Sequence, residues 1–590
     1  MNQHHNQAAS SIPGTTQPVG PARLWLIASL GGVLLWLSQP PAALAPIAWI
    51  ALVPWAMLVA WPNPLARRQY IAIWLVGSAY WLITLQGIRL AHPAIYPAWL
   101  ALALFLGLYI LLFVGLARVV HHRWHWPLYW AVPVIWSGLE LVRSYALTGL
   151  SATLLGHSQI DWLWVVQIGD IGGTYWVSFI VAMVSAWLAS VLAAFLRWGQ
   201  PADKPRAQAG NLANVPKLGT AIVCGVLLMT CGYGYWRTAD NDQRAAQSPI
   251  LNTLLIQRNE PLMYAMSPAR EMEVFQNYVD TTIAAMSKSK DVDLIIWPES
   301  MFTGGLPYRI IEEPFIVPPN EDFTAAEFSE IIAQQQDSFV NRNRWFQGML
   351  ANVSATKPPP LLVGSAVYRY AERPRAFGAA LLIDQDSKVV DWYAKMHLVM
   401  FGEYIPFADW FPWLYEIGPM SQGALPGEAP VAMSIQGATV APSICFEAMV
   451  EHVTGDGLRT LAAQGTPADL IVNLTNDAWF DGTAVLDHHR RCAQMVALIN
   501  RRPLLMVGNA GPTVWINGSG QVVRALSHQT NDSMLAQPKP DNRSSLYARW
   551  GDKLSWPFAA VCLLAATFGW RDRRRATRLR SELDKVHSPN

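Results

Sequence analysis

Three polar residues, each closing or following a short apolar run, could together carry out covalent acyl transfer. They are Glu299, Lys395 and Cys445. A thiol attacks an acyl carbon as the thiolate, and a free cysteine with a pKa near ~8.5 is mostly protonated at neutral pH. A nearby carboxylate that takes the thiol proton, and an ammonium that favours the anion, would remove this handicap. The three residues are therefore candidates for one active site.

The position of each candidate at the end of a predicted strand supports this grouping. Glu299 follows the run Asp-Leu-Ile-Ile-Trp-Pro, in which the proline ends the strand. Cys445 lies between the strand-like run 440–444 and a predicted helix. A strand-to-helix turn exposes a side chain and leaves backbone N–H groups free for a developing oxyanion. Taken singly, a glutamate or lysine is usually a surface residue and a cysteine is usually in the core, so only the combination is informative.

The second half of the chain has the pattern of an α/β domain, which we expect over residues 250–548. Helical stretches, such as 268–288 and 484–501, alternate with short β-rich runs at 251–257, 293–297, 361–367, 379–383, 470–473 and 503–507. Nearly continuous apolar strands separated by helices indicate sheets that are covered on a face by helices. Residues 306–358, rich in proline and polar residues, break this rhythm and are expected to form an insertion or lid.

The composition indicates two regions in different solvents. Of the 590 residues, 52% are hydrophobic and only 14% are charged, against about a quarter in soluble proteins. No Asp or Glu precedes Glu140.

The net charge of +2 gives no reason to expect a nucleic-acid partner. The five cysteines have no spacing typical of a disulfide framework. His488 and His489 diverge on a helix, so we expect no metal and no cofactor.

Eight apolar segments predict a multi-pass membrane protein with a membrane domain over residues 23–237. They run over 23–38, 42–61, 70–88, 95–117, 126–147, 171–196, 218–236 and 554–570. The distribution of Lys and Arg places both termini in the cytoplasm. The N-terminal tail (1–22) is expected to be disordered, and the C-terminal tail (571–590) is basic. The large domain then lies on the outer face of an inner membrane. Ala43-Leu44-Ala45 has the form of a cleavage site, but residues 1–22 contain no Lys or Arg, which favours an uncleaved anchor.

Glu140 and Arg143 are the charged residues of the fifth apolar segment. They are three residues apart, so they share one face of the predicted helix. Charges at membrane depth usually face a bundle interior or a polar cavity. A structural ion pair and a substrate-facing role both remain open for them.

Taken together, the motifs resemble the apolipoprotein N-acyltransferase family over about residues 23 to 570. The motifs that carry this resemblance most strongly are Trp297-Pro298-Glu299, Tyr393-x-Lys395-x-His397-Leu398, Phe401-Gly402-Glu403-Tyr404 and Ile444-Cys445-Phe446-Glu447. Asn473-x-x-Asn476-Asp477-Ala478-Trp479-Phe480, Arg502-Pro503-Leu504-Leu505, Gly156-x-Ser158-Gln159, Trp136, Glu140 and Arg143 add to it. Departures from the family pattern are Leu150-Ser151-Ala152 for Phe-Pro-Trp, Met400 for Pro, Phe446 for Tyr and Arg258 for Gly.

The resemblance implies a fold, a reaction and a location. The fold would be an α-helical membrane domain of about eight transmembrane helices plus a nitrilase-like αββα sandwich. The enzyme would move a fatty acyl chain from the sn-1 position of a phospholipid to the α-amine of a diacylglyceryl-cysteine lipoprotein. Glu299 would be the general base, Lys395 the oxyanion stabiliser and Cys445 the nucleophile. Supporting roles would fall to Glu403, Glu447, Phe446, Glu140 and Arg143. We expect a monomer in a bacterial inner membrane with a periplasmic catalytic domain.

Two other functions remain open. A membrane-tethered amidase or nitrilase would use the same three residues with water as the second nucleophile. A catalytically inactive scaffold that binds lipoproteins is the other class, although three intact candidate residues argue against a dead site.

Overall fold

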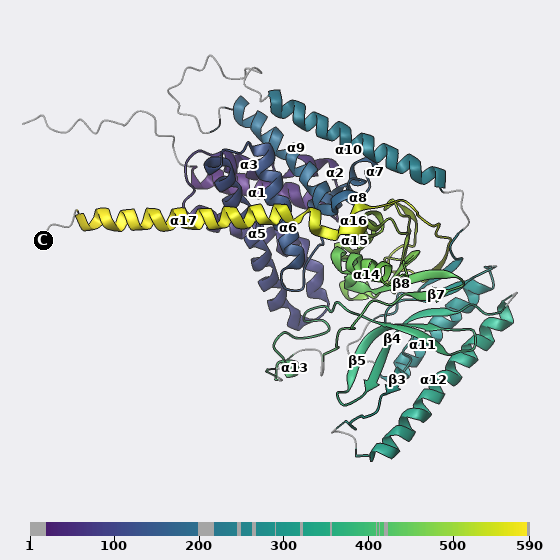
Figure 1. The fold of residues 1–590 in the computed structure, drawn as a ribbon. Helices are drawn as coiled ribbons and strands as arrows, with labels where there is room; N and C mark the ends of the chain where they lie inside the picture. The colour runs from purple at the N-terminus through teal and green to yellow at the C-terminus, as the bar shows by residue number, and fades with distance from the viewer. Residues whose placement is uncertain are drawn as a thin grey trace, which may run out of the picture.

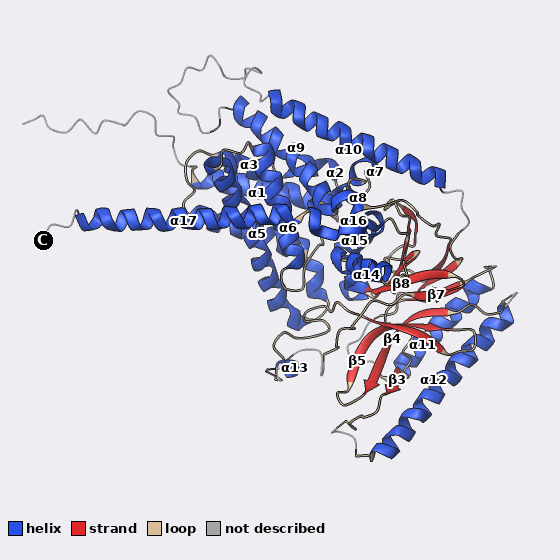
Figure 2. Ribbon diagram, viewed as in Figure 1, coloured by secondary structure: helices blue, strands red, loops and turns tan. Residues whose placement is uncertain are grey.

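The computed structural model of the chain combines a bundle of helices with a part rich in strands (Figures 1 and 2). The structure describes residues 19–196, 198, 217–244, 249–261, 267–289, 291–318, 322–354, 357–408, 410–411, 413–417 and 423–586, without the side chains of 241–244, 572–573 and 575–586. Residues 1–18 and 587–590 of the two expected tails lie outside the described residues.

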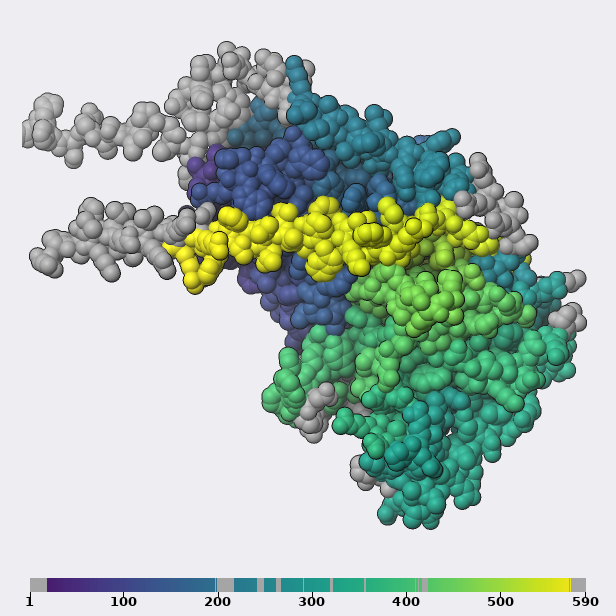
Figure 3. Space-filling model, viewed as in Figure 1, coloured from purple at the N-terminus to yellow at the C-terminus, as the bar shows by residue number. Residues whose placement is uncertain are grey.

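Five helical segments among the described residues are long and apolar enough to cross a membrane, judged by length and composition. They belong to α1 (Pro21–Ser38), α5 (Tyr96–Arg123), α9 (Thr174–Phe195), α10 (Lys217–Arg244) and α17 (Trp556–Val586). Helix α17 runs along the bundle and projects beyond it (Figure 3). These five correspond to five of the eight apolar segments expected from the sequence.

The other three expected crossings are helical but do not reach that standard. The segment 42–61 is broken at Leu52 into two short helices, α2 (Ala45–Ala51) and α3 (Val53–Ala60). Helices α4 (Arg67–Thr84) and α6 (Leu128–Tyr145) have 18 residues each. The first begins with two arginines, and the second contains the charged pair Glu140 and Arg143. Their side chains pack with those of α1 and α5 in one buried apolar core.

An irregular stretch connects α6 to α9 and faces the strand-rich part. It contains the 3₁₀ helix η3 (Leu155–Gln159) and the short helices α7 (Leu163–Val166) and α8 (Gly169–Gly172). All five residues of η3 are buried. Irregular backbone in a membrane protein must be covered by protein or water, and protein covers η3.

The strands form two sheets. The seven-stranded sheet has the order β13-β1-β2-β4-β5-β6, and β3 pairs with β4 at its side. Its strands are β1 (Thr253–Gln257), β2 (Leu294–Trp297), β3 (Tyr308–Ile311), β4 (Leu361–Tyr370), β5 (Arg375–Ile383), β6 (Val389–Ala394) and β13 (Asp532–Ala536). The central pairs β1–β2 and β2–β4 are parallel.

The six-stranded sheet has the order β12-β11-β10-β9-β8-β7. Its strands are β7 (Met433–Ile435), β8 (Ala438–Ile444), β9 (Leu470–Thr475), β10 (Leu504–Gly508), β11 (Val514–Ile516) and β12 (Val522–Ala525). The pairs β8–β9 and β9–β10 are parallel, so their carboxyl ends lie at one edge.

Apolar side chains of the two sheets meet in one buried cluster that includes Ile296 and Leu382 from one sheet and Val440 and Val472 from the other. Helices α11 (Pro268–Met286) and α12 (Ala325–Val353) cover the outer face of the first sheet (Figure 1). On the second sheet, α14 (Glu451–Ala463) and α15 (Ala484–Asn500) form the outer layer. The domain is therefore an αββα sandwich.

Helix α12 lies within the stretch 306–358 that was expected to be an insertion or lid. Phe339, Phe346 and Leu350 are fully buried in a cluster with Ile295 and Trp297 of β2. A capping box at Thr324 and Glu327 begins the helix. Residues 325–353 are thus a layer of the domain core.

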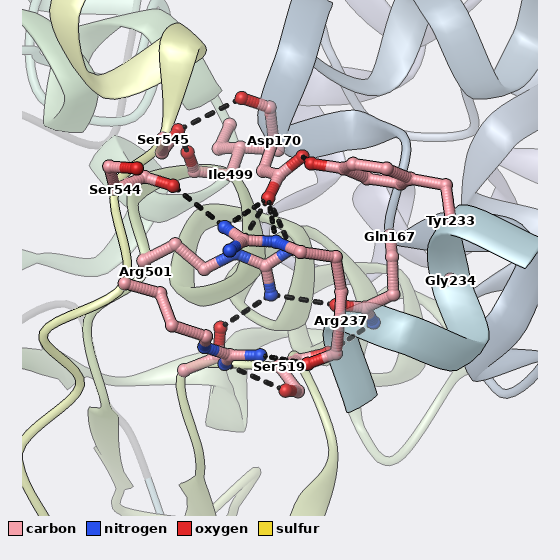
Figure 4. A network of polar contacts seen from close by, with 12 residues as sticks. Gln167, Asp170, Tyr233, Gly234, Arg237, Ile499, Arg501, Ser519, Ser544 and Ser545 are labelled. Carbon is pink, nitrogen blue, oxygen red and sulfur yellow. Dashed lines mark hydrogen bonds and ion pairs between the residues drawn. The ribbon is translucent and has the colours of Figure 1, made fainter. Parts of the chain in front are cut away.

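A buried polar network centred on Asp170 joins the two parts of the molecule (Figure 4). Asp170 Oδ2 accepts hydrogen bonds from Nε and Nη2 of Arg501 at 3.0 and 2.6 Å, and from Nε of Arg237 at 2.8 Å. Its Oδ1 accepts one from the Tyr233 hydroxyl at 2.6 Å. Asp170 lies on α8, Arg237 and Tyr233 on α10, and Arg501 directly after α15. The network therefore ties the irregular stretch to the sandwich.

Candidate active site

Lys395 lies at the end of β6 between two carboxylates. Its Nζ donates to Glu403 Oε1 at 2.6 Å and to Glu299 Oε1 at 3.1 Å. The lysine side chain is 1% exposed, whereas those of Glu299 and Glu403 are 15% and 24% exposed. Glu403 Oε2 also accepts from the backbone N–H of Val399 at 2.8 Å, which fixes the carboxylate. The ammonium is therefore held in place from two sides.

Cys445 begins the 3₁₀ helix η6 (Cys445–Ala448) directly after β8. Its φ of +49° lies in the left-handed region, which is uncommon for a residue with a side chain. Glu299 follows the carboxyl end of β2, and Cys445 follows that of β8, in the facing sheet. The turn at the end of β8 presents a partly buried thiol.

Glu447 holds the backbone on both sides of this site. Its Oε1 accepts from the Tyr393 hydroxyl at 2.8 Å and from the N–H groups of Met396 and His397 at 2.7 and 3.0 Å. Its Oε2 accepts from the N–H of Ile444 at 2.6 Å. One buried carboxylate thus connects the segment after Lys395 to the residue before Cys445.

The electrostatics favour a protonated thiol next to a poised base. Burial raises the pKa of Cys445 well above its usual value, and the negative charge of Glu299 adds to this, against the Lys395 ammonium, which lowers it. Burial likewise raises the pKa of Glu299, opposed by Lys395 and assisted by the charge of Glu403. Burial alone would lower the pKa of Lys395, but the two carboxylates outweigh it and raise that pKa well above its usual value. Lys395 is therefore a fixed positive charge.

Other predicted residues lie around this cluster at different depths. Phe446 follows the thiol and stacks on His397, with ring centroids 5.7 Å apart. His397 Nε2 lies 2.7 Å from the backbone oxygen of Thr148, in the loop after α6. The loop that includes the departure Leu150-Ser151-Ala152 therefore reaches the surroundings of the candidate site.

Glu140 and Arg143 are buried in the helical bundle instead. Glu140 Oε1 accepts from Trp136 Nε1 at 2.9 Å and from the N–H of Leu155 at 2.7 Å. Arg143 donates to the backbone oxygen of Ala152 at 3.1 Å, and its guanidinium lies 4.7 Å from the centroid of the Trp81 ring. Among the ion pairs of the described residues, none joins Glu140 to Arg143. Each residue supports the irregular stretch that contacts the sandwich.

Three residues at the site were not assigned a role from the sequence. Asn473 Nδ2 and His489 Nε2 lie 3.3 and 3.0 Å from the backbone oxygen of Cys445. His489 Nδ1 lies 2.7 Å from Oδ2 of Asp477. Asn473 and Asp477 belong to a motif that carried the resemblance. Asn473 lies on β9 and Asp477 directly after it, next to β8, and this position was the available signal. His489 was considered only as a metal ligand. In the described part of the chain, no group of three or more His, Cys, Asp or Glu side chains could hold a metal ion.

Comparisons with known proteins match both parts of the molecule. Residues 31–187 match the family described as apolipoprotein N-acyltransferase N-terminal domain, and residues 255–542 match the carbon-nitrogen hydrolase family. The apolipoprotein N-acyltransferase of Rhodopirellula baltica is 35% identical over 583 residues, which cover 93% of this chain and 99% of that protein. The chain belongs to the apolipoprotein N-acyltransferase family. It is accordingly an acyltransferase with a carbon-nitrogen hydrolase domain.

Further comparisons extend this likeness. The apolipoprotein N-acyltransferase of Geobacter metallireducens is 26% identical, with 93% of this chain and 96% of that protein covered. Among solved structures, Saccharomyces cerevisiae Nit3, a member of branch 10 of the nitrilase superfamily, is 14% identical. That match covers 50% of this chain and 91% of the other, with a TM-score of 0.33.

Proposed function

We propose that this apolipoprotein N-acyltransferase moves a fatty acyl chain from the sn-1 position of a phospholipid to the α-amine of a diacylglyceryl-cysteine lipoprotein, through a thioester on Cys445. The observation that carries this proposal is the buried Lys395 ammonium, held by Glu299 and Glu403 and lowering the pKa of Cys445. A nucleophile, a base of raised pKa and a fixed cation are the parts that two-step acyl transfer requires.

In the first half-reaction, Glu299 takes the proton of the Cys445 thiol as Sγ forms a bond to the ester carbon. The Lys395 ammonium, with backbone N–H groups of the turn, stabilises the oxyanion of the tetrahedral intermediate. The bond from carbon to the glycerol oxygen then breaks. The leaving oxygen takes the proton from Glu299, lysophospholipid departs, and the acyl group remains on Cys445.

In the second half-reaction, the α-amine of the lipoprotein attacks the thioester carbon. Glu299 takes the amine proton as the carbon–nitrogen bond forms, and Lys395 again faces the oxyanion. The carbon–sulfur bond breaks, and the proton returns to the sulfur of Cys445. Lys395 keeps its proton throughout, so the protons of both half-reactions pass through Glu299.

Lipid substrates are supported by exposed aromatic side chains in the segment that carries Glu403. Phe401, Phe407 and Phe411 are 40%, 65% and 51% exposed. Exposed apolar groups that gather in one segment are typical of a surface that meets lipid or another protein. Acyl chains of a donor lipid and of a diacylglyceryl acceptor would have apolar partners here, next to the base and the ammonium.

The supporting residues hold the catalytic residues and nearby segments in place and take no part in making or breaking bonds. We assign Glu403 to holding Lys395, and Glu447 to fixing the segments on both sides of the site. Phe446 shields the thiol through its contact with His397. Glu140 and Arg143 hold the loop after α6, which touches the catalytic domain at His397.

We further propose eight membrane crossings, with α2–α3, α4 and α6 added to the five apolar helices. Support comes from the arginines at the start of α4 and the end of α5, which positive-inside placement puts in the cytoplasm. Both termini are then cytoplasmic, and the catalytic domain is periplasmic at the inner membrane. We also propose a monomer, because Glu299, Lys395 and Cys445 come together within one chain and the site needs no residue from a second copy.

Intact mass measurement tests the proposed function. The purified protein is incubated with a phospholipid whose sn-1 and sn-2 chains differ in mass, with Cys445→Ala as control. We expect the mass increment of the sn-1 chain on the parent protein alone, removed when a diacylglyceryl peptide is added. An increment lost to water without peptide would indicate a hydrolase. No increment in a folded sample would favour the binding scaffold.

A further inference from the structure

His489 is a fully buried histidine whose two ring nitrogens both face oxygen atoms. Nε2 lies 3.0 Å from the backbone oxygen of Cys445, and Nδ1 lies 2.7 Å from Oδ2 of Asp477. The exposed fraction of the His489 side chain is 0%, and that of Asp477 is 2%. The oxygen of Cys445 belongs to the proposed nucleophile, so this contact reaches the reacting residue through its backbone.

Donor and acceptor chemistry defines what the ring does there. A carbonyl oxygen only accepts, so Nε2 must carry the hydrogen of the bond to Cys445. The carboxylate of Asp477 also accepts, and its Oδ1 already receives the Thr475 hydroxyl at 3.2 Å. The ring therefore links the Asp477 carboxylate to the backbone of the turn that begins at Cys445.

The backbone that this bond holds is in a strained conformation. Cys445 has φ of +49°, and a non-glycine residue stays in that region only when its surroundings hold it there. Asn473 Nδ2 is the second donor to the same oxygen, at 3.3 Å. Two side chains from β9 and α15 therefore fix the direction of this carbonyl group and, with it, that of the thiol.

Helix α15 is a rigid support for the histidine. One face, with Ala493 and Val496, packs on the six-stranded sheet. Another face, with Met495 and Leu498, packs on Val165 and its neighbours in the irregular stretch of the membrane part. A helix that is buried on several sides cannot shift without disturbing both domains.

We propose that His489, paired with Asp477, is a positioning residue that holds the backbone of Cys445 so that its thiol points at the acyl carbon. The inference rests on the proposed function in taking Cys445 as the nucleophile. The ring nitrogens of His489 face the Cys445 backbone oxygen and the Asp477 carboxylate, and we assign the ring no contact with the reacting atoms. Its effect should therefore be on the rate of Cys445 chemistry and not on the affinity for lipid.

Two substitutions of His489 separate positioning from simple space filling. In His489→Gln the side-chain amide reaches about as far as Nε2, so it can still donate to the Cys445 oxygen. In His489→Asn the amide reaches only about as far as Nδ1. It can still contact Asp477, but it cannot donate to the backbone oxygen of Cys445. If the ring served only to pair with Asp477, the asparagine variant would be the milder one. Positioning of Cys445 predicts the opposite order.

The matched control is the adjacent histidine of the same helix. Burial, with the charge of Arg491 assisting, lowers the pKa of His488 to about 3, so its ring is neutral. Its Nε2 has no hydrogen-bond partner among the described residues. His488→Asn therefore changes a buried histidine of α15 without removing a contact to the nucleophile.

Two rates are measured in the full-length, folded protein. Alkylation of Cys445 by iodoacetamide, followed by mass spectrometry of its peptide, needs no lipid or acceptor. Acyl-enzyme formation from phospholipid is followed by intact mass in single turnover. For His489→Asn we expect a fall of about a hundredfold in acyl-enzyme formation, the size of effect known for small misplacements of a reacting group. Alkylation should fall in the same direction, with an unchanged phospholipid KM, and His489→Gln should recover most of both rates.

The outcomes are decisive in each direction. Unchanged rates in His489→Asn, a glutamine variant as slow as the asparagine variant, or an equal fall in His488→Asn would each overturn the proposal. If His489→Asn does not fold, His489→Met replaces it, being as long as glutamine but without a donor. Alkylation could be slowed in His489→Asn while the parent protein itself forms no acyl-enzyme. This result would uphold the positioning role and reject the proposed function.

Discussion

Two buried charged clusters in this molecule have opposite compositions. At the junction of the two domains, the guanidinium groups of Arg237 and Arg501 converge on one carboxylate, that of Asp170. At the candidate active site, two carboxylates, Glu299 and Glu403, converge on one ammonium, that of Lys395. An arginine keeps its proton at any ordinary pH and binds carboxylates through a rigid fork. The junction is therefore suited to holding parts together.

The active-site cluster has the opposite property, since protons can move within it. Burial raises the pKa values of Cys445 and Glu299, so a thiol and a carboxyl group compete for one proton. Only Lys395 is fixed in its charged form. The difference teaches that buried charge alone does not mark a reactive site. A reactive site also needs groups that can change protonation state at modest cost.

The largest effect should come from removing the sulfur. Cys445→Ala deletes one atom of the reactive cluster and keeps the contacts of the backbone oxygen with His489 and Asn473. We expect complete loss of acyl-enzyme in the intact mass spectrum, with a thermal unfolding midpoint close to that of the parent protein. A residual acyl adduct on this variant would place the nucleophile elsewhere.

Removing the cation should weaken the chemistry strongly but not abolish it. Lys395→Met keeps the length of the side chain and removes the charge that faces the developing oxyanion. Loss of one such group typically costs about 10²–10³ in rate. We expect a fall of this size in acyl-enzyme formation, measured in single turnover.

The protein with Lys395→Met should still fold, because the raised pKa of Glu299 lets this buried carboxyl group become neutral when the ammonium is gone. Far-ultraviolet circular dichroism and gel filtration in detergent serve as the control. Acylation at the parental rate would remove Lys395 from the proposed mechanism.

The junction should respond in the reverse manner. Among the described residues, Arg501→Met leaves Arg237 and Tyr233 as the side-chain partners of the buried Asp170. Because Arg237 still pairs with this carboxylate, the cost should be below the about 3–5 kcal/mol that a buried charge without a partner would cost. We expect a marked fall in the thermal unfolding midpoint, whereas the folded fraction should form acyl-enzyme at the parental rate. A variant that is stable but slow would show that the two clusters are not separate in function.

Local patterns in the sequence were sufficient to predict much of this architecture. Each candidate residue follows an apolar strand, and the eight apolar segments coincide with helices, because both signals are contained in a few consecutive residues. The expected lid was a different case. Proline and polar residues dominate 306–358, but Phe328, Ile332, Phe339, Phe346 and Leu350 recur at helical spacing and form the buried face of α12.

Contacts between distant residues could not be predicted in this way. His489 and Cys445 are 44 residues apart, and His397 and Thr148 are 249 apart. The Arg501–Asp170 pair spans 331 residues. None of these contacts has a periodicity or a composition of its own, because packing of whole elements brings the partners together. They include the residues that the sequence left without a role.

The smallest effect should be a change in the pH dependence of acylation. Glu299 acts as a base only when deprotonated, so the rate falls as the pH drops through its pKa, which burial holds above the usual range. The charge of Glu403 raises that pKa further, whereas Lys395 lowers it. Glu403→Gln should therefore move the acid limb of the rate profile to lower pH, and Lys395→Met should move it to higher pH. Acyl-enzyme formation followed across the pH range in which each variant stays folded measures both shifts. A shift of the acid limb in the same direction in both variants would mean that the limb reports a group outside this cluster, because a negative charge raises and a positive charge lowers the pKa of any group close to both.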